Sequence, residues 1–363
     1  MTLFIGEPPC GGFPWSTRQN WTLTRIRKIL YTKMIHINLV TGFKTQNFIH
    51  QLDKFRYDGK IEFKENSTED IVWDYVVVYE SLPSNVIFKC KKGGLIFISG
   101  EPRDSNPYCK EFFNQFDHII SSHTWYKRPN HHLSQQALDY HFGKSFKTRQ
   151  CKYNYESLKN MPVPQKKKAM SMMASSKRMM PGHVKRYDLL MELKRLYANK
   201  IDFYGDGVNF VDDKADSILP YMFHICIENS SVPHYWTEKI ADSLLGYAVP
   251  IYYGAPNILD YFPQKAIIWL DLNNTKACVQ TISEILEQPE KIYNEMLPYL
   301  VEARNKLLDE YNIFPTLEKF IMEHPTSDEV KNVMIKPYQS MKSFKNRLLR
   351  LRIRRLIFKW FHI

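Results

Sequence analysis

The sequence contains few cysteines and no long apolar run. Its six cysteines are scattered and no two form a Cys-x-x-Cys pair, so the spacing argues against a zinc site or a disulfide framework. Scattered cysteines also favour a reducing compartment. No window approaches the roughly 20 apolar residues of a membrane-spanning helix, and residues 1–15 hold Gly and Pro where a signal peptide has an apolar core. From these absences we expect a cytoplasmic protein that is soluble or peripheral to a membrane.

The sequence lacks a dinucleotide-binding glycine motif, and its adjacent histidines do not have the spacing of metal ligands on a helix. The chain has no Gly-x-Gly-x-x-Gly sequence, which makes a dinucleotide-dependent activity a weak hypothesis. His131 and His132 are adjacent rather than four residues apart, so we interpret them as loop histidines and as a poor metal site.

Positive charge is in excess. Lys and Arg number 50 against 38 acidic residues, which gives a net charge of +12 and a pI near 9.2. Such a balance favours an anionic partner, which is nucleic acid, anionic lipid or a phosphate-bearing substrate. Much of the excess lies in residues 340–363, where there is no acidic residue. This distribution argues against a nucleic-acid-binding cleft in the body of the protein.

The segment 340–363 predicts a basic amphipathic helix. At helical spacing one face carries Leu349, Ile353, Leu356 and Trp360, and another carries Arg347, Arg350 and Arg354. A helix of this kind with terminal aromatic residues suits the surface of an anionic membrane. A helix packed back on the domains and a contact between two copies of the chain are the alternatives.

Two series of apolar runs predict two parallel sheets. The first series is Met34–Val40, Ile61–Lys64, Tyr75–Tyr79, Leu95–Ser99 and His118–Ser122, and the second is Met170–Ser175, Ile201–Gly205, His224–Asn229, Val249–Gly254 and Ala266–Asp271. Between them lie the helical segments Asn47–Phe55, Arg186–Leu196 and Lys239–Tyr247. Continuous apolar strands that alternate with helices are typical of parallel sheets covered on both faces.

We therefore expect an α/β protein with two Rossmann-like domains that face each other across a cleft. The first domain is placed at residues 1–160, the second at residues 161–330 and the basic tail at residues 331–363. The Lys-rich segment Lys144–Lys168 has few apolar residues, and we interpret it as the connector.

Glu101 follows the predicted strand Leu95–Ser99 and the turn at Gly100. The carboxyl end of a parallel strand faces the ligand cleft. A partly desolvated carboxylate at that place has a raised pKa and can act as a general base. A solvated glutamate in a turn is the alternative interpretation.

A second polar group gathers where a strand of the second series gives way to a helix. Asn229, Tyr235, Glu238 and Lys239 surround the helix N-terminus, a ready anion site for which Thr237 is the expected N-cap. Lys239 can neutralise a diphosphate, Tyr235 can donate to it, and Glu238 can accept from ribose hydroxyls. This combination suits a nucleotide sugar, and a capped helix with an ordinary Glu-Lys pair is the alternative.

Arg186 stands at the start of the helical segment RYDLLMELKRL, after a Met-Pro-Gly loop. A cation near a helix start opposes the helix dipole, so helix propensity does not explain it. A fixed guanidinium can clamp a phosphate through two hydrogen bonds. A surface arginine is the alternative.

The stretch ENSSVPHYWTEKIADSLLGYAVPIYYGAPN resembles the donor-binding signature of the family 10 (GT10) α-1,3/1,4-fucosyltransferases. That pattern has E-N-S, a short spacer, Y-x-T-E-K, a small residue, A-V-P or I-P, and a Gly-Pro-rich turn. The likeness extends from about Ala169 to Asp271 and is looser over the first half, where it rests on DYVVVYESL and FISGEP. Cys226-Ile227 departs from the more usual C-F, and His183 stands where some members carry a second Arg.

The resemblance implies a GT-B type fold and a site for GDP-fucose. Its donor-binding residues would be Arg186, Asn229, Tyr235, Glu238 and Lys239, and Glu101 matches the family's G-E position for the proposed base. The implied reaction is an inverting transfer of L-fucose from GDP-β-L-fucose to a hydroxyl of a glycan. No Asp-x-Asp occurs, so we expect no metal site, no required cofactor and a divalent metal that is at most stimulatory.

The resemblance also implies partners. They are GDP-fucose, an oligosaccharide or glycolipid acceptor, and an anionic membrane surface bound through residues 340–363, with no nucleic acid. The acceptor sugar would be GlcNAc or Glc of a lipopolysaccharide-type or other cell-surface glycan, joined by an α-1,3 or α-1,4 linkage. The protein would then lie at the inner face of the membrane. A GT-B enzyme for another nucleotide sugar and a non-catalytic, membrane-associated glycan-binding protein are the alternatives.

Overall fold

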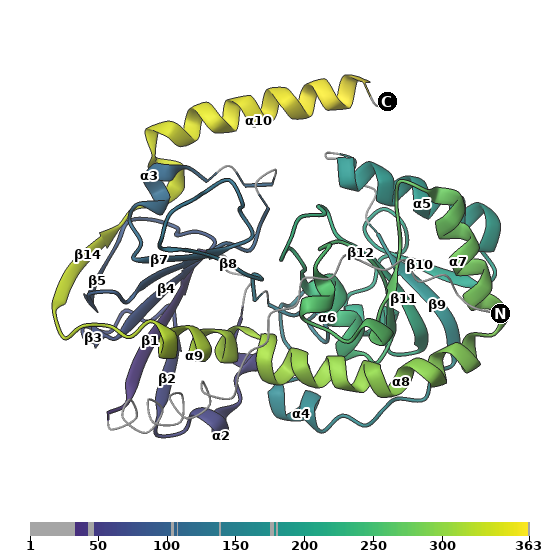
Figure 1. The fold of residues 1–363 in the computed structure, drawn as a ribbon, viewed down its shortest axis with the longest axis horizontal. Coiled ribbons are helices and arrows are strands. Elements are labelled where there is room, and N and C mark those ends of the chain that lie inside the picture. Colours follow the sequence, from purple (N-terminus) through teal and green to yellow (C-terminus); the bar gives the residue numbers. More distant parts are fainter. Residues whose placement is uncertain are drawn as a thin grey trace, which may run out of the picture.

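Two α/β lobes lie side by side in the computed structural model, which describes residues 33–42, 47–102, 105–106, 108–137, 139–174, 178 and 181–361. In Figure 1 the purple and blue strands form one lobe and the teal and green strands form the other. Helix α8 (Pro289–Lys306) runs along the second lobe, and α9 (Ile313–Glu323) continues onto the first. The predicted α/β class with two sheet domains is confirmed.

The N-terminal domain is built on a parallel sheet of order β2-β1-β4-β6-β7-β8. Its strands are β1 (Ile35–Thr41), β2 (Ile61–Glu65), β4 (Tyr75–Tyr79), β6 (Leu95–Ile98), β7 (His118–Ser121) and β8 (His131–Leu133). The sequence predicts the first five of these strands. The prediction of a loop at the two adjacent histidines is wrong, because His131 and His132 pair with Ile119 and Ile120 of β7.

The predicted helix Asn47–Phe55 is divided into η1 (Ile49–Gln51) and α2 (Lys54–Tyr57). Asp53 explains the break. Its backbone is extended, with φ −76° and ψ 95°, and its side chain accepts a hydrogen bond from the Arg56 amide at 3.1 Å. The aspartate therefore ends one helical turn and caps the next.

The C-terminal domain has a parallel sheet of order β10-β9-β11-β12-β13. Its strands are β9 (Lys168–Met173), β10 (Ile201–Tyr204), β11 (Tyr221–Ile227), β12 (Val249–Tyr253) and β13 (Ile268–Trp269), and its helices include α5 (Pro181–Tyr197), α6 (Glu238–Leu245) and α7 (Thr275–Glu287). All five predicted strands are present. Thr237 caps α6 by accepting from the Lys239 amide, which confirms the predicted N-cap.

After α8 the chain returns to the N-terminal domain. A π-helical turn, Leu307–Tyr311, leads into α9, which buries Ile313, Phe314 and Leu317 in the core of the first sheet. The next strand, β14 (Val330–Ile335), pairs with β5 (Val86–Lys91) in a small sheet completed by β3 (Val72–Trp73). Residues 313–330, which the sequence places in the second domain, therefore pack with the first.

Helix α10 (Lys342–Phe361) extends from the N-terminal lobe near α3 (Lys110–Phe113) (Figure 1). Met341 and Phe344 are buried in the N-terminal core, whereas Leu349, Ile353 and Leu356 are exposed. No helix within the described part of the chain has both the length and the apolarity of a membrane span.

Candidate active site

A cavity of about 320 Å³ lies where the carboxyl ends of the two sheets meet. The N-terminal domain contributes Glu80 and Glu101, which follow β4 and β6, and the C-terminal domain contributes part of the segment 229–239 after β11. Ligands bind at this end of open parallel sheets. Five of the six predicted site residues line the cavity, and Arg186 is linked to it through Asn229.

The N-terminus of α6 forms the C-terminal wall of the cavity. The Lys239 ammonium lies 3.0 Å from Thr237 Oγ1, 3.1 Å from Glu238 Oε1 and 3.3 Å from Glu228 Oε2. Glu228 is completely buried and accepts the Thr237 amide at 2.8 Å and its hydroxyl at 2.7 Å. The buried carboxylate thus fixes both the helix start and the lysine.

Burial and neighbouring charges have opposite effects on the pKa values of Glu238 and Lys239. Burial works to raise the pKa of Glu238, but Lys239 and Lys214 outweigh it and hold the pKa well below its usual range. Burial works to lower the pKa of Lys239, but Glu228 and Glu238 outweigh it and raise the pKa. Both groups are therefore charged at neutral pH, and the helix start offers a cation for phosphate beside an acceptor for hydroxyls.

Arg186 lies in the second turn of α5, because the helix begins at Pro181 rather than at Arg186 as the sequence suggested. It is buried, and its Nη1 donates to Asn229 Oδ1 at 3.1 Å. Gly182 permits this approach, since a Cβ there would lie 2.2 Å from the Asn229 carbonyl oxygen. Burial lowers the pKa of Arg186, and the Glu228 and Glu238 carboxylates work against that effect.

Tyr235 is nearly inaccessible, with 2% of its surface exposed, and still lines the cavity. Burial raises its pKa well above the ordinary value, with Glu101, Glu228 and Glu238 acting in the same direction. The hydroxyl therefore keeps its proton and can donate it in a hydrogen bond to a bound oxygen.

Glu101 faces this wall from the other domain. Its backbone is fixed, because its amide donates to Glu80 Oε1 at 2.6 Å and its carbonyl accepts from Ser99 Oγ and His123 Nε2, each at 2.9 Å. Burial raises the pKa of the Glu101 carboxyl, and Lys239 works to lower it. A side chain of this kind can serve as a general base toward a hydroxyl held near Lys239.

Glu80 is a site residue that sequence reasoning missed. It is buried, and its Oε2 accepts hydrogen bonds from the Tyr108 hydroxyl and from Asn106 Nδ2. Burial, together with the charge of Glu101, raises its pKa to about 7. A sequence signal for it was available, because Glu80 directly follows the predicted strand Tyr75–Tyr79, as Glu101 follows the next strand in the sheet.

Residues 139–149, which lead into the connector and begin it, also line the cavity. His141 lines the cavity and is half-buried, and desolvation lowers the pKa of its ring to about 3, so the ring is neutral. The amides of His141 and Phe142 each donate to Asp242 Oδ1 of α6 at 2.9 Å. Asp139 and Lys144 form a buried ion pair beside it. Composition marked the residues from Lys144 onward as a linker and gave no sign that Lys144, Phe146 and Arg149 line a site.

The fold and the site define a two-domain α/β protein of the GT-B type, with the start of α6 at the wall of a cavity between the domains. Residues 163–307 match the model of the family described as "Glycosyltransferase family 10 (fucosyltransferase) C-term". Over these residues the chain is similar to glycosyltransferase family 10, which agrees with the resemblance carried by the E-N-S and Y-x-T-E-K sequences.

Named relatives are similar to part of the chain. The chain is 35% identical over 122 residues to alpha-(1,3)-fucosyltransferase B of Drosophila melanogaster, which is 33% of this chain and 26% of that protein. It is 31% identical over 88 residues to alpha-(1,3)-fucosyltransferase FucT of Helicobacter pylori, which is 24% of this chain and 18% of that protein. The similarity thus spans about a quarter or less of the length of each relative.

Solved structures resemble the chain over a longer range. A crystal structure of alpha1,3-fucosyltransferase with GDP-fucose aligns with 82% of this chain and 92% of its own, at 18% identity and a TM-score of 0.47. The structure with GDP aligns over 82% and 91%, at 17% identity and a TM-score of 0.48.

Proposed function

We propose that the protein is an inverting fucosyltransferase that moves L-fucose from GDP-β-L-fucose to a hydroxyl of a glycan. One observation carries the proposal: Glu101 of the N-terminal domain and Lys239 of the family 10 domain line the same cavity and interact electrostatically. The names of the two fucosyltransferase relatives support fucose as the sugar.

In the donor half, cationic and protic groups converge where a diphosphate would lie. Lys239, Arg186 and the Tyr235 hydroxyl would stabilise the charge that builds on GDP as the bond from fucose C1 to oxygen breaks. Glu238, which stays ionised, would accept from the ribose hydroxyls. Asn229 holds Arg186 in place. These groups would do this without a required cofactor, and a divalent metal would be at most stimulatory.

In the acceptor half, Glu101 would take the proton of the acceptor hydroxyl as the oxygen attacks C1 of fucose. GDP would leave from the opposite face, so the β-linked donor would give an α-fucoside. The raised pKa of Glu101 brings it closer to neutral pH, where a base is both ionised and able to accept a proton. Closure of the two domains would exclude water that otherwise hydrolyses the donor.

We further propose the acceptor class and the place of action. The acceptor would be GlcNAc or Glc in a lipopolysaccharide-type or other cell-surface glycan, with an α-1,3 or α-1,4 linkage. The basic α10, with Leu349, Ile353 and Leu356 exposed, would hold the protein on the anionic inner face of a membrane.

The test is release of GDP from GDP-fucose by the purified protein, first without an acceptor and then with a panel of labelled glycans. We expect slow hydrolysis without acceptor and transfer to at least one GlcNAc- or Glc-containing glycan. Faster turnover of another nucleotide sugar would show that this sugar, and not GDP-fucose, is the donor. If GDP-fucose is neither bound nor consumed, the protein is not a fucosyltransferase.

A further inference from the structure

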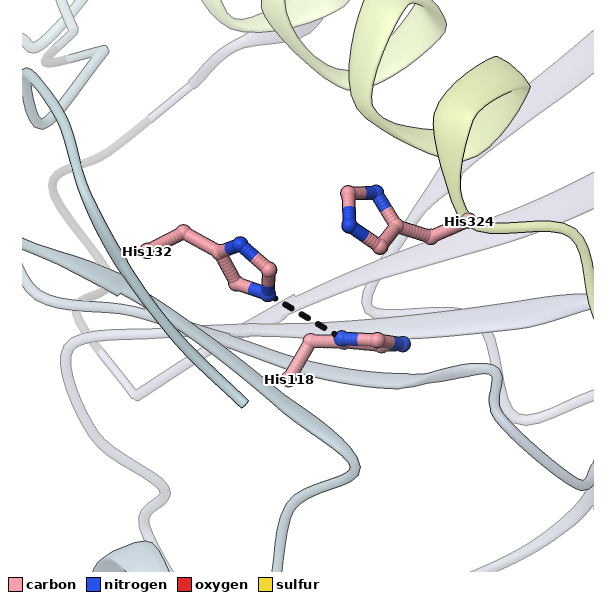
Figure 2. A group of neighbouring side chains, drawn as sticks. All are labelled: His118, His132 and His324. Atoms are coloured by element: carbon pink, nitrogen blue, oxygen red, sulfur yellow. Dashed lines mark hydrogen bonds between the residues drawn. The ribbon is translucent and has the colours of Figure 1, made fainter. Parts of the chain in front are cut away.

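Three histidines from distant parts of the sequence meet at one edge of the N-terminal sheet. His118 is the first residue of β7, His132 lies in β8, and His324 follows the last turn of α9. Figure 2 shows the His118 and His132 rings in contact, with the His324 ring above them. One ring nitrogen from each lies within 4.8 Å of the others. Such convergence is the first requirement of a metal site.

The nearest ring nitrogens of His118 and His132 share a hydrogen bond, and a cation that replaced its proton would find the two nitrogens at a suitable distance. His118 Nδ1 and His132 Nε2 are 3.2 Å apart. Ligand nitrogens at about 2.0–2.1 Å from a tetrahedral zinc ion lie about 3.3 Å from each other. The His324 nitrogen lies within 4.8 Å of the other two nitrogens. To reach the tetrahedral spacing from them, it would have to move by about 1.5 Å at most. His324 follows the C-terminal turn of α9, so its side chain sits at the end of a helix and not within one.

A hydrogen bond to the Phe320 carbonyl orients the His324 ring for metal binding. Its Nδ1 lies 2.9 Å from the carbonyl oxygen of Phe320, and since a carbonyl can only accept, Nδ1 carries the proton. Nε2 therefore keeps a free lone pair. A histidine that ligates a metal usually donates its other ring proton to a carbonyl or a carboxylate, which fixes the ring.

One phenylalanine packs against all three rings. Phe320 stacks on His324 with ring centroids 4.2 Å apart at 14°, and it meets His118 and His132 edge to face.

We propose that His118, His132 and His324 bind a divalent transition cation, zinc by preference, with a water at the fourth position. Imidazole ligands suit zinc, copper and nickel and not magnesium or calcium. The site lies at the amino end of β7, whereas Glu101 follows the carboxyl end of β6. It is therefore separate from the candidate active site, and the proposal does not depend on the proposed function.

The cation would join the returning segment to the sheet. Two of the ligands belong to the sheet edge and the third to α9, which is separated from them by about half of the chain. A bound ion would link these elements directly and would stabilise only the folded state, since no preformed site exists in an unfolded chain. The spacing of the cysteines could not reveal this site, because all three of its proposed ligands are histidines.

The test uses the full-length chain without a histidine tag, stripped with a chelator and dialysed against zinc. We expect close to one tightly bound zinc per chain by elemental analysis, and a rise of several degrees in the thermal midpoint of unfolding. His132→Gln and His324→Gln should each lose that zinc and the rise. His36→Gln is the matched control, because His36 lies in β1 and bonds to Glu62 away from the cluster.

A second measurement keeps the test decisive if a variant does not fold. Cobalt bound to the wild-type chain should show the intense visible absorption of a four-coordinate site, and added zinc should remove it. If the wild-type protein takes up no zinc, or if its midpoint does not change, the three rings are only an aromatic cluster and the proposal fails. Equal zinc content in the wild type and in a folded His324→Gln protein would also overturn it.

Discussion

Two glutamates at neighbouring strand ends share one wall of the cavity and differ in their surroundings. Glu80 is buried, and three protein donors point at its carboxylate, from Tyr108, Asn106 and the Glu101 amide. Glu101 is less buried, and its side chain lines the cavity opposite Lys239. Their environments therefore suit Glu101 to react with a ligand and Glu80 to position the backbone of Glu101.

Replacing Glu101 with Gln should separate chemistry from binding. Gln keeps the size and the hydrogen bonding of the side chain but cannot accept a proton, so kcat for fucosyl transfer should fall about 10²–10⁴-fold. The dissociation constant for GDP, measured by calorimetry, should change less than twofold. Glu302→Gln, an exposed change in α8, should leave both values unchanged. Loss of GDP binding in Glu101→Gln would remove Glu101 from the role of base.

Glu80 should make the folded protein less stable as the pH rises. Its pKa is about 7 in the folded state and about 4.3 in an unfolded chain. The folded state therefore holds more protons between these values, and the free energy of unfolding falls as the pH rises through them. Glu80→Gln should remove up to about 3 kcal/mol of this decrease between pH 4 and pH 7.5.

Urea unfolding at a series of pH values would measure that slope. Glu302→Gln should keep the slope of the wild type, because this glutamate is exposed. An unchanged slope in Glu80→Gln would show that Glu80 is already ionised in the folded protein at low pH.

At the scale of elements, the start of α6 depends on one threonine. Thr237 caps the helix, and its amide and hydroxyl both donate to the buried Glu228. Thr237→Ala removes the cap and leaves part of a buried carboxylate unsatisfied, which should lower the free energy of unfolding by about 2–3 kcal/mol. Because Lys239 also contacts Thr237, affinity for GDP should fall as well.

Thr275→Ala is the matched control for this prediction. Thr275 is the first residue of α7 and is exposed, while the neighbouring Asn274 provides the cap. Its free energy of unfolding should change by less than about 0.5 kcal/mol in urea titrations. A Thr237→Ala protein as stable as this control would mean that Glu228 finds another donor.

Elements whose partners are local were predictable from the sequence, and those with distant partners were not. The strands of both sheets are continuous apolar runs, and the signature sequence placed Asn229, Lys239 and their neighbours on one helix start. β14 is different, because its residues are mostly exposed and it exists through pairing with β5, about 240 residues earlier. No local pattern marks such a strand. The cluster of His118, His132 and His324 escaped prediction for the same reason.

At the scale of the whole molecule, the chain passes between the domains twice. It leaves the N-terminal domain through the connector and returns after α8 through the turn Leu307–Tyr311. Just before the connector, the His141 amide donates to Asp242 of α6, and the Tyr140 hydroxyl donates to the carbonyl of Leu307 at 3.2 Å. The two crossings between the domains therefore contact each other.

The packing of residues near the start of α10 in the N-terminal core determines how much of the C-terminal tail can be deleted without loss of stability. Met341 and Phe344 belong to the N-terminal core and Leu348 packs against it, whereas Leu349 is exposed. Deleting residues 349–363 should therefore leave the thermal midpoint within about 2 °C of the wild type. Deleting residues 340–363 removes two buried hydrophobic side chains, each worth about 2–5 kcal/mol when truncated, and should lower the midpoint markedly.

The shorter deletion then tests the membrane proposal without disturbing the fold. Wild-type protein should sediment with vesicles of phosphatidylglycerol and phosphatidylcholine and stay in solution with phosphatidylcholine alone, because basic residues gain about 1 kcal/mol each near an anionic surface. The chain without residues 349–363 should stay in solution with both vesicle types. It should also keep wild-type transfer to a soluble acceptor, since the cavity lies in the two domains. Equal sedimentation of the two proteins would show that α10 is not the membrane anchor.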